Sequence, residues 1–296
     1  TLNDNSVTAS QASGRITADL LEADADNGMT LNTNVKFVDL ELSEAGNIQL
    51  TNQQSLDLTH VVTADGAIDV TVFGNLVVTD VRTLGTSDRN DISLTTHDLT
   101  LSSSADITVI NLQNGARGDL SFNIEGKIDI SGTSTLVADA LSVKVAGGLT
   151  LTTQVNSLSV ETTRVGDVSI TQGTRALVLT KVWLAEGDFT LEAGDFVNNV
   201  GGKVDVADVR ILSNKDAVGD TDADISIKAV GDILVRYASA GIYTETDADK
   251  PVVRAEDGAD GAVVSYSSAT SAGDIKLEST RGRIGETYSD SNVDIV

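Results

Sequence analysis

A short phrase recurs along this chain: glycine and aspartate, then an apolar residue, a variable and usually polar residue, and a second apolar residue. Five copies keep this order, at residues 118–122 (GDLSF), 166–170 (GDVSI), 187–191 (GDFTL), 231–235 (GDILV) and 273–277 (GDIKL). Counting looser copies, the first apolar position recurs with a mean step of about 20 residues, at Met29, Ile48, Ile68, Ile92, Ile107, Ile128, Leu149, Val168 and Phe189. A roughly fixed period of this length is typical of a solenoid, in which each repeat forms one coil.

Between the glycines, apolar and polar residues alternate, as in residues 141–145 (LSVKV). This period of two indicates strands with one face buried, and the Gly, Asn and Asp residues that interrupt it indicate tight turns. The sequence therefore predicts an all-β fold, a right-handed parallel β-helix with coils of about 20 residues. The expected hand follows the general preference of parallel crossovers.

Composition supports a regularly stacked interior: aromatic residues are only 3% of the chain, and there is no cysteine for a disulfide. The one proline, Pro251, falls where the repeat lapses, and proline is excluded from central strands. We expect residues 1–27 to form an N-terminal cap or an irregular first coil. Residues 28–296 would form the β-helix, with an inserted loop at about 243–261.

The charge is strongly acidic, since 44 Asp and Glu stand against 20 Lys and Arg, a net charge of −24. Phosphates repel such a surface, so nucleic acid is not an expected partner. No stretch approaches the roughly 20 apolar residues of a membrane span. Asp220, Asp222 and Asp224 alternate along the chain and would share one face of a strand, where they could bind Ca²⁺. The alternative is that they are solvated turn residues.

One segment resembles a known family more closely. Residues 271–285 (SAGDIKLESTRGRIG) are similar to a repeat of filamentous-haemagglutinin-like bacterial exoproteins, which carry a Gly-Asp-Ile-x-Leu strand, a short Ser/Thr turn and a Gly-x-Ile-Gly corner. The repeat pattern extends over most of residues 28–296, although its coils vary more in length than those of the most regular members. The resemblance implies a right-handed parallel β-helix that is secreted or displayed on the cell surface.

Two classes of function follow. The first is a non-enzymatic structural or adhesive segment of a bacterial surface protein: a stalk, an adhesin or a filament subunit. Its expected partners are neighbouring segments or copies stacked end to end, or a host-surface or polysaccharide receptor. The second is a polysaccharide-binding or polysaccharide-cleaving β-helix. A groove lined with aromatic residues, carboxylates and a basic residue would favour this second class. The single tryptophan, Trp183, lies in an apolar run, however, and His60 and His97 lack metal-binding companions. We therefore expect no enzymatic activity and no cofactor other than Ca²⁺.

Overall fold

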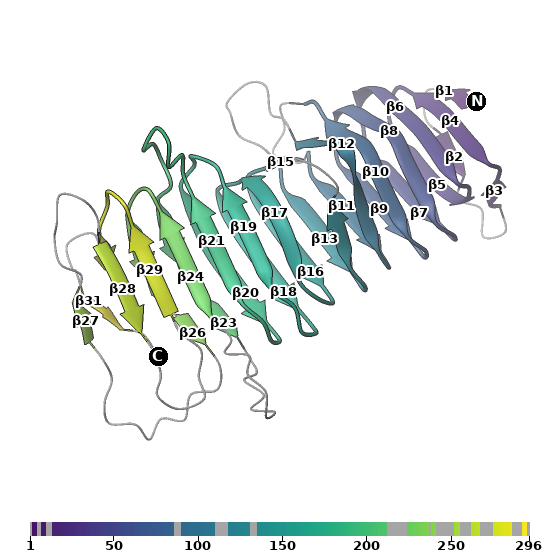
Figure 1. Ribbon diagram of the computed structural model, residues 1–296. Coiled ribbons are helices and arrows are strands. Elements are labelled where there is room, and N and C mark those ends of the chain that lie inside the picture. The colour runs from purple at the N-terminus through teal and green to yellow at the C-terminus, as the bar shows by residue number, and fades with distance from the viewer. Residues whose placement is uncertain are drawn as a thin grey trace. The chain divides into compact units, whose positions relative to one another are not determined.

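The structure is a computed structural model of the whole chain. It describes residues 2–4, 7–9, 14–85, 90–109, 118–130, 135–211, 224–236, 238–240, 252–254, 262–266, 275–285 and 292–294. These residues form strands and turns, with no helix among them, and the chain divides into two compact units, Thr1–Val145 and Ala146–Val296. Each unit is a β-solenoid in which parallel strands of successive coils stack on one another (Figure 1). The predicted fold class, all-β with stacked parallel strands, is confirmed.

Unit 1 contains two stacks of strands. The first contains β1 (Leu2–Asp4), β4 (Leu20–Ala25), β6 (Phe37–Ala45), β8 (Leu56–Asp65), β10 (Leu76–Thr83), β12 (Leu99–Val109), β14 (Ile128–Ile130) and β15 (Thr135–Val137). The second contains β2 (Val7–Ala9), β3 (Ile16–Thr17), β5 (Met29–Asn34), β7 (Ile48–Asn52), β9 (Ile68–Val72), β11 (Ile92–Thr96), β13 (Leu120–Ile124) and β16 (Ala140–Val145). The chain alternates between the two stacks, so each coil contributes one long strand to each stack.

Unit 2 repeats this plan. Its first stack contains β17 (Leu149–Gln154), β19 (Val168–Gln172), β21 (Phe189–Ala193), β24 (Ile225–Ala229), β29 (Ile275–Ser279) and β28 (Ala262–Tyr266). Its second contains β18 (Ser157–Thr162), β20 (Leu177–Leu184), β22 (Val204–Val206), β23 (Val209–Ile211), β25 (Ile233–Val235), β26 (Ala238–Ala240) and β30 (Ile284–Gly285). A separate antiparallel pair joins β27 (Val252–Arg254) to β31 (Asn292–Asp294).

The core of each unit consists of columns of apolar side chains that repeat from coil to coil. In unit 1 one column contains Met29, Ile48, Ile68, Ile92, Leu120 and Leu141, all at most 4% exposed. In unit 2 a column of the first stack contains Leu149, Val168, Phe189, Ile225 and Ile275. Burying each such side chain contributes roughly 1.5–3 kcal/mol, so the stacked columns supply most of the driving force.

Residue intervals along the columns show the coil length. Met29 pairs with Ile48 and Ile48 with Ile68, steps of 19 and 20 residues. Longer steps accommodate insertions between strands, as from Phe189 to Ile225 (36 residues) and from Ile225 to Ile275 (50 residues).

The nine positions counted as one series in the sequence fall in two stacks: the first four, Met29 to Ile92, belong to the second stack, and the other five belong to the first. Ile107 and Ile128 pair with strands of the first stack of unit 1, opposite Val81 and Leu99, whereas Ile92 belongs to the second stack. Ile128 follows a corner as Ile92 does, because both corners of a coil favour the same glycine-then-apolar phrase. Ile107 instead lies within β12, after an irregularity in its pairing with β10.

Two of the predicted segments are described only in part. Within residues 1–27 the structure places β1 and β4 beside the strands of the first stack and β2 and β3 beside β5. Of the predicted loop at 243–261, only β27 is described. Along the described chain, no helix is long and apolar enough to cross a membrane.

Candidate functional site

The aspartate of the recurring phrase holds neighbouring coils together. In unit 2 the backbone N–H of Asp188 donates to Asp167 Oδ1 (3.0 Å), and that of Asp224 donates to Asp188 Oδ1 (2.9 Å). In unit 1 the N–H of Asp119 donates in the same way to Asp91 Oδ1 (2.9 Å). Each carboxylate therefore accepts a hydrogen bond from the equivalent position one coil further on. The sequence indicated only that aspartate suits a turn, because this bond joins residues 21 or more positions apart.

The predicted calcium ligands fall mostly outside the described residues, which include Asp224 but neither Asp220 nor Asp222. Asp224 directly precedes β24, and its carbonyl oxygen accepts a hydrogen bond from Phe189 N (2.8 Å). Across the described ranges, no three His, Cys, Asp or Glu side chains gather in a way that could hold a metal ion. Calcium binding through these three aspartates stays a prediction.

The tryptophan and one histidine lie on outward-facing positions and are held by charged neighbours. Trp183 is half-buried, and its Nε1 donates to Asp208 Oδ2 (3.0 Å). Lys181 Nζ lies 4.0 Å from the centre of the indole ring and so covers one of its faces. His60 Nδ1 lies 2.7 Å from Asp80 Oδ2. Since Lys181 occupies an indole face, Trp183 does not offer the bare platform that a sugar-stacking site needs.

Asp57 is an acidic residue in an unfavourable setting. It lies on β8 between Phe37 and Val77 of the adjoining strands, and its Oδ1 is fully covered, with no hydrogen-bond partner among the described residues. Burial raises the pKa of Asp57 above its usual value of 3.8. The folded protein therefore binds this proton more tightly than the unfolded chain does, and stability is lost as the pH rises from 3.8 through the raised pKa.

Substitution Asp57→Asn should therefore raise the Tm at pH 7, because the amide keeps the shape without the buried charge. The gain should shrink as the pH falls toward 3.8, where the wild-type carboxyl becomes protonated in both states. Thermal unfolding followed by circular dichroism between pH 3.5 and pH 7.5 would measure it. The control is Asp69→Asn, which removes one charge from an exposed position in the same unit. An equal gain in both variants would show that overall charge, not burial, is responsible.

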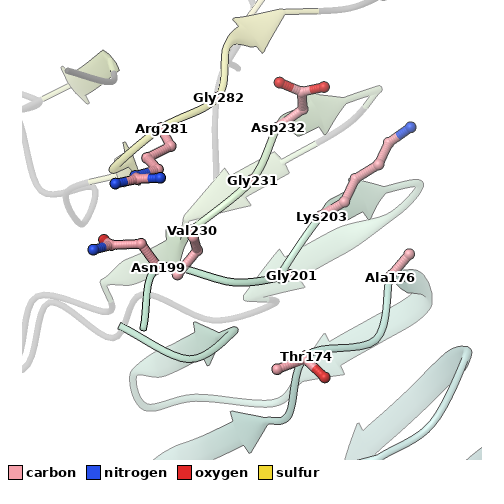
Figure 2. A pocket seen from close by; sticks show the side chains of 11 residues that line it. Thr174, Ala176, Asn199, Gly201, Lys203, Val230, Gly231, Asp232, Arg281 and Gly282 are labelled. Carbon is pink, nitrogen blue, oxygen red and sulfur yellow. The ribbon is translucent and has the colours of Figure 1, made fainter. Parts of the chain in front are cut away.

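Unit 2 has a hollow at the corner where the chain enters its second stack (Figure 2). The cavity has a volume of about 400 Å³ and is formed by four successive coils. Because Leu177, Val204, Ile233 and Ile284 are in register, the residues just before them are stacked as well. Three glycines that precede these strands, Gly202, Gly231 and Gly282, line the cavity one above another.

Backbone crowding explains why glycine occupies this corner. A Cβ on Gly202 would lie 2.2 Å from Ala193 O, and one on Gly282 would lie 2.3 Å from Asp232 N. Gly202 also has a φ of 73°, which side-chain-bearing residues rarely adopt. The floor of this corner is therefore backbone without side chains, buried at Gly202 and half-buried at Gly231 and Gly282.

Polar and charged side chains border this floor. Figure 2 shows Arg281 and Asn199 on one side of the cavity and Lys203 and Asp232 on the other. Asp232 Oδ1 accepts a hydrogen bond from Arg283 N (2.9 Å), so its carboxylate is fixed to the next coil. The Arg281 side chain is exposed, and its guanidinium has no hydrogen-bond or ion-pair partner within the described part of the chain. The sequence contains no motif for this site, since its residues are spread from Thr174 to Gly282.

A second hollow, of about 490 Å³, lies at a glycine corner of unit 1. Gly46, Gly66, Asp65 and Asp91 are among its lining residues. Asn47 also lines it, and its Oδ1 accepts a hydrogen bond from Ala67 N (2.9 Å). In the described lining the two carboxylates are the only charged side chains, so this hollow is acidic, whereas the hollow of unit 2 contains Lys203 and Arg281.

The chain was compared with protein-family models, with curated proteins and with solved structures, and no match was found in any of the three.

Proposed function

We propose that this chain is a non-enzymatic, extracellular structural or adhesive segment of a bacterial surface protein. The observation that carries the proposal is the repetition itself: the same buried apolar column and the same Asp-to-backbone hydrogen bond recur from coil to coil. A fold stabilised by neighbour-to-neighbour contacts can be extended by adding coils, and it serves well as a spacer that displays loops. Residues 275–279 and 284–285 of the segment that resembles filamentous-haemagglutinin-like repeats form β29 and β30, which supports this class of protein.

Among the structural roles, a stalk or adhesin segment is favoured over a filament subunit. In unit 2 the strand β28 pairs antiparallel with β29, while the other described pairings of that stack are parallel. A strand of reversed direction interrupts the parallel pairing that a second solenoid would have to continue. End-to-end polymerisation through this edge is therefore disfavoured.

Polysaccharide cleavage is less well supported than binding. Glycoside hydrolysis requires two carboxyl groups about 5–10 Å apart across the sugar. Among the residues that the structure describes, Asp232 is the only acidic one that lines the hollow of unit 2. The described lining of this hollow has groups suited to hold a ligand but no second carboxylate.

The extracellular location and the absence of polysaccharide cleavage can each be tested with the purified chain. Antibodies raised against the purified chain should label intact cells of the producing bacterium, and the chain should release no new reducing ends from a panel of acidic and neutral polysaccharides. Labelling that requires permeabilised cells would contradict the extracellular role, and new reducing ends would contradict the non-enzymatic one. Electron microscopy of the purified chain should show separate particles; long fibres would instead favour the filament subunit.

A further inference from the structure

The hollow of unit 2 is a basic site on an acidic protein. Four basic residues, Arg175, Lys203, Arg281 and Arg283, fall in the three stacked positions that precede the second-stack strands, and two of them, Lys203 and Arg281, line the hollow itself. Asp232 is the one acidic residue in these positions. The whole chain has only 20 basic residues and a net charge of −24. A local concentration of positive charge in a concave site attracts anions even when the rest of the surface repels them.

The side chains of the lining indicate which kind of anion would bind. Arg281 presents a guanidinium that has no partner among the described residues, and its planar fork matches the two oxygens of a carboxylate. Asn199, on the same side, offers an amide that both donates and accepts hydrogen bonds. On the opposite side, Asp232 accepts them and Lys203 donates them. A ligand that suits this set carries one negative group and several hydroxyls.

The size and the floor of the hollow fit a sugar ring. A volume of about 400 Å³ falls within the range of small-molecule sites, roughly 300–1,000 Å³. The half-buried Gly231 and Gly282 let a ring approach the backbone, and among the described residues no aromatic side chain lines the cavity to favour stacking of a flat base. We propose that this corner binds an acidic sugar, with Arg281 holding its carboxylate and with Asn199 and Asp232 bonded to its hydroxyls.

The interaction can be measured on the purified whole chain by isothermal titration calorimetry with trigalacturonate. We expect binding that weakens as salt is raised, because exposed charges are screened. Replacing the charged guanidinium in Arg281→Ala should weaken binding at least about tenfold. Asn199→Gly removes the amide from a residue whose φ is 55°, and it should weaken binding less. In all variants the Tm shows whether the fold is intact.

The matched control is Arg236→Ala. Arg236 is an exposed arginine of the same unit that pairs with Asp205 (2.6 Å) and lies outside the cavity lining, so its loss should leave affinity within about twofold. Absence of binding at millimolar trigalacturonate, or equal loss in both arginine variants, would overturn the proposal. So would equal binding of neutral galactotriose. If a sulfated trisaccharide bound more tightly than trigalacturonate, and Arg281→Ala abolished the difference, the group that Arg281 recognises would be a sulfate ester and not a carboxylate. None of these results depends on where the protein resides, so they test the site separately from the surface role.

Discussion

Replacing Asn52 by leucine is expected to destabilise unit 1 by about 3–5 kcal/mol. Asn52 is completely buried at the end of β7, where an apolar residue would ordinarily be favoured. Its Oδ1 accepts hydrogen bonds from Thr33 Oγ1 (2.8 Å) and Val35 N (2.9 Å). Its Nδ2 donates to Val35 O (3.0 Å) and Gln54 O (2.8 Å). One side-chain amide therefore supplies hydrogen-bond partners to polar groups of two neighbouring coils, Thr33 and Val35 on one and Gln54 on the other.

A leucine side chain has nearly the same size but can satisfy none of these groups. The N–H and carbonyl of Val35 would then remain buried without partners, and each unsatisfied group costs about 1–3 kcal/mol. Denaturant unfolding gives the free energy, and hydrogen exchange should show the loss concentrated in β5 and β7. The neighbouring Gln53→Ala, at an exposed position, should change stability by less than about 0.5 kcal/mol. A leucine variant as stable as the wild type would show that the turn does not need the amide.

A buried side-chain amide also hydrogen-bonds to a turn in unit 2, so the prediction can be tested at a second position. Gln172 is also completely buried, and its Oε1 accepts from Thr153 Oγ1 (2.7 Å) while its Nε2 donates to Val155 O (2.7 Å). The threonine, the turn and the amide are arranged as they are around Asn52. We therefore expect Gln172→Leu to destabilise unit 2 in the same direction.

The second large effect is expected from Gly66→Ala, with a loss of about 2–5 kcal/mol. Gly66 lies at a corner of unit 1 with a φ of 149°, and a Cβ built there would lie 2.0 Å from Gly46 O. Alanine would have to push two coils apart. That movement would strain the hydrogen bond from Gly66 N to Asn90 Oδ1 (2.7 Å).

Gly147 provides the matched comparison, because a Cβ there would meet nothing closer than Val165 O at 3.6 Å. Gly147→Ala should be neutral, or stabilising by up to about 1 kcal/mol through a less flexible unfolded chain. Both variants can be compared by denaturant unfolding. If Gly66→Ala proved as mild as Gly147→Ala, the corners would be looser than their close backbone contacts imply.

The sequence by itself determined the class of fold. The alternation of apolar and polar residues specified strands with one buried face, and the spacing from Met29 to Ile48 to Ile68 specified the coil. These signals are local: each depends on a residue and its near neighbours, so they can be read without knowing which strands pair. The acidic charge and the scarcity of aromatic residues are likewise properties of composition alone.

The tertiary structure decided what depends on register. Only stacking assigned Ile92 and Ile128 to different sheets, because both corners of a coil favour the same residues. Only stacking showed that the Asp188 carboxylate accepts a hydrogen bond from the backbone N–H of Asp224, 36 residues away. The same holds for the hydrogen bond from Val35 N, in the turn of the preceding coil, to Asn52 Oδ1. The hollow beside Arg281 needs four coils in register across intervals of unequal length, from Leu177 to Val204, Ile233 and Ile284. Hydrogen bonds and cavities between coils arise from the pairing of distant segments, and a repeat with variable insertions does not encode that pairing in any local pattern.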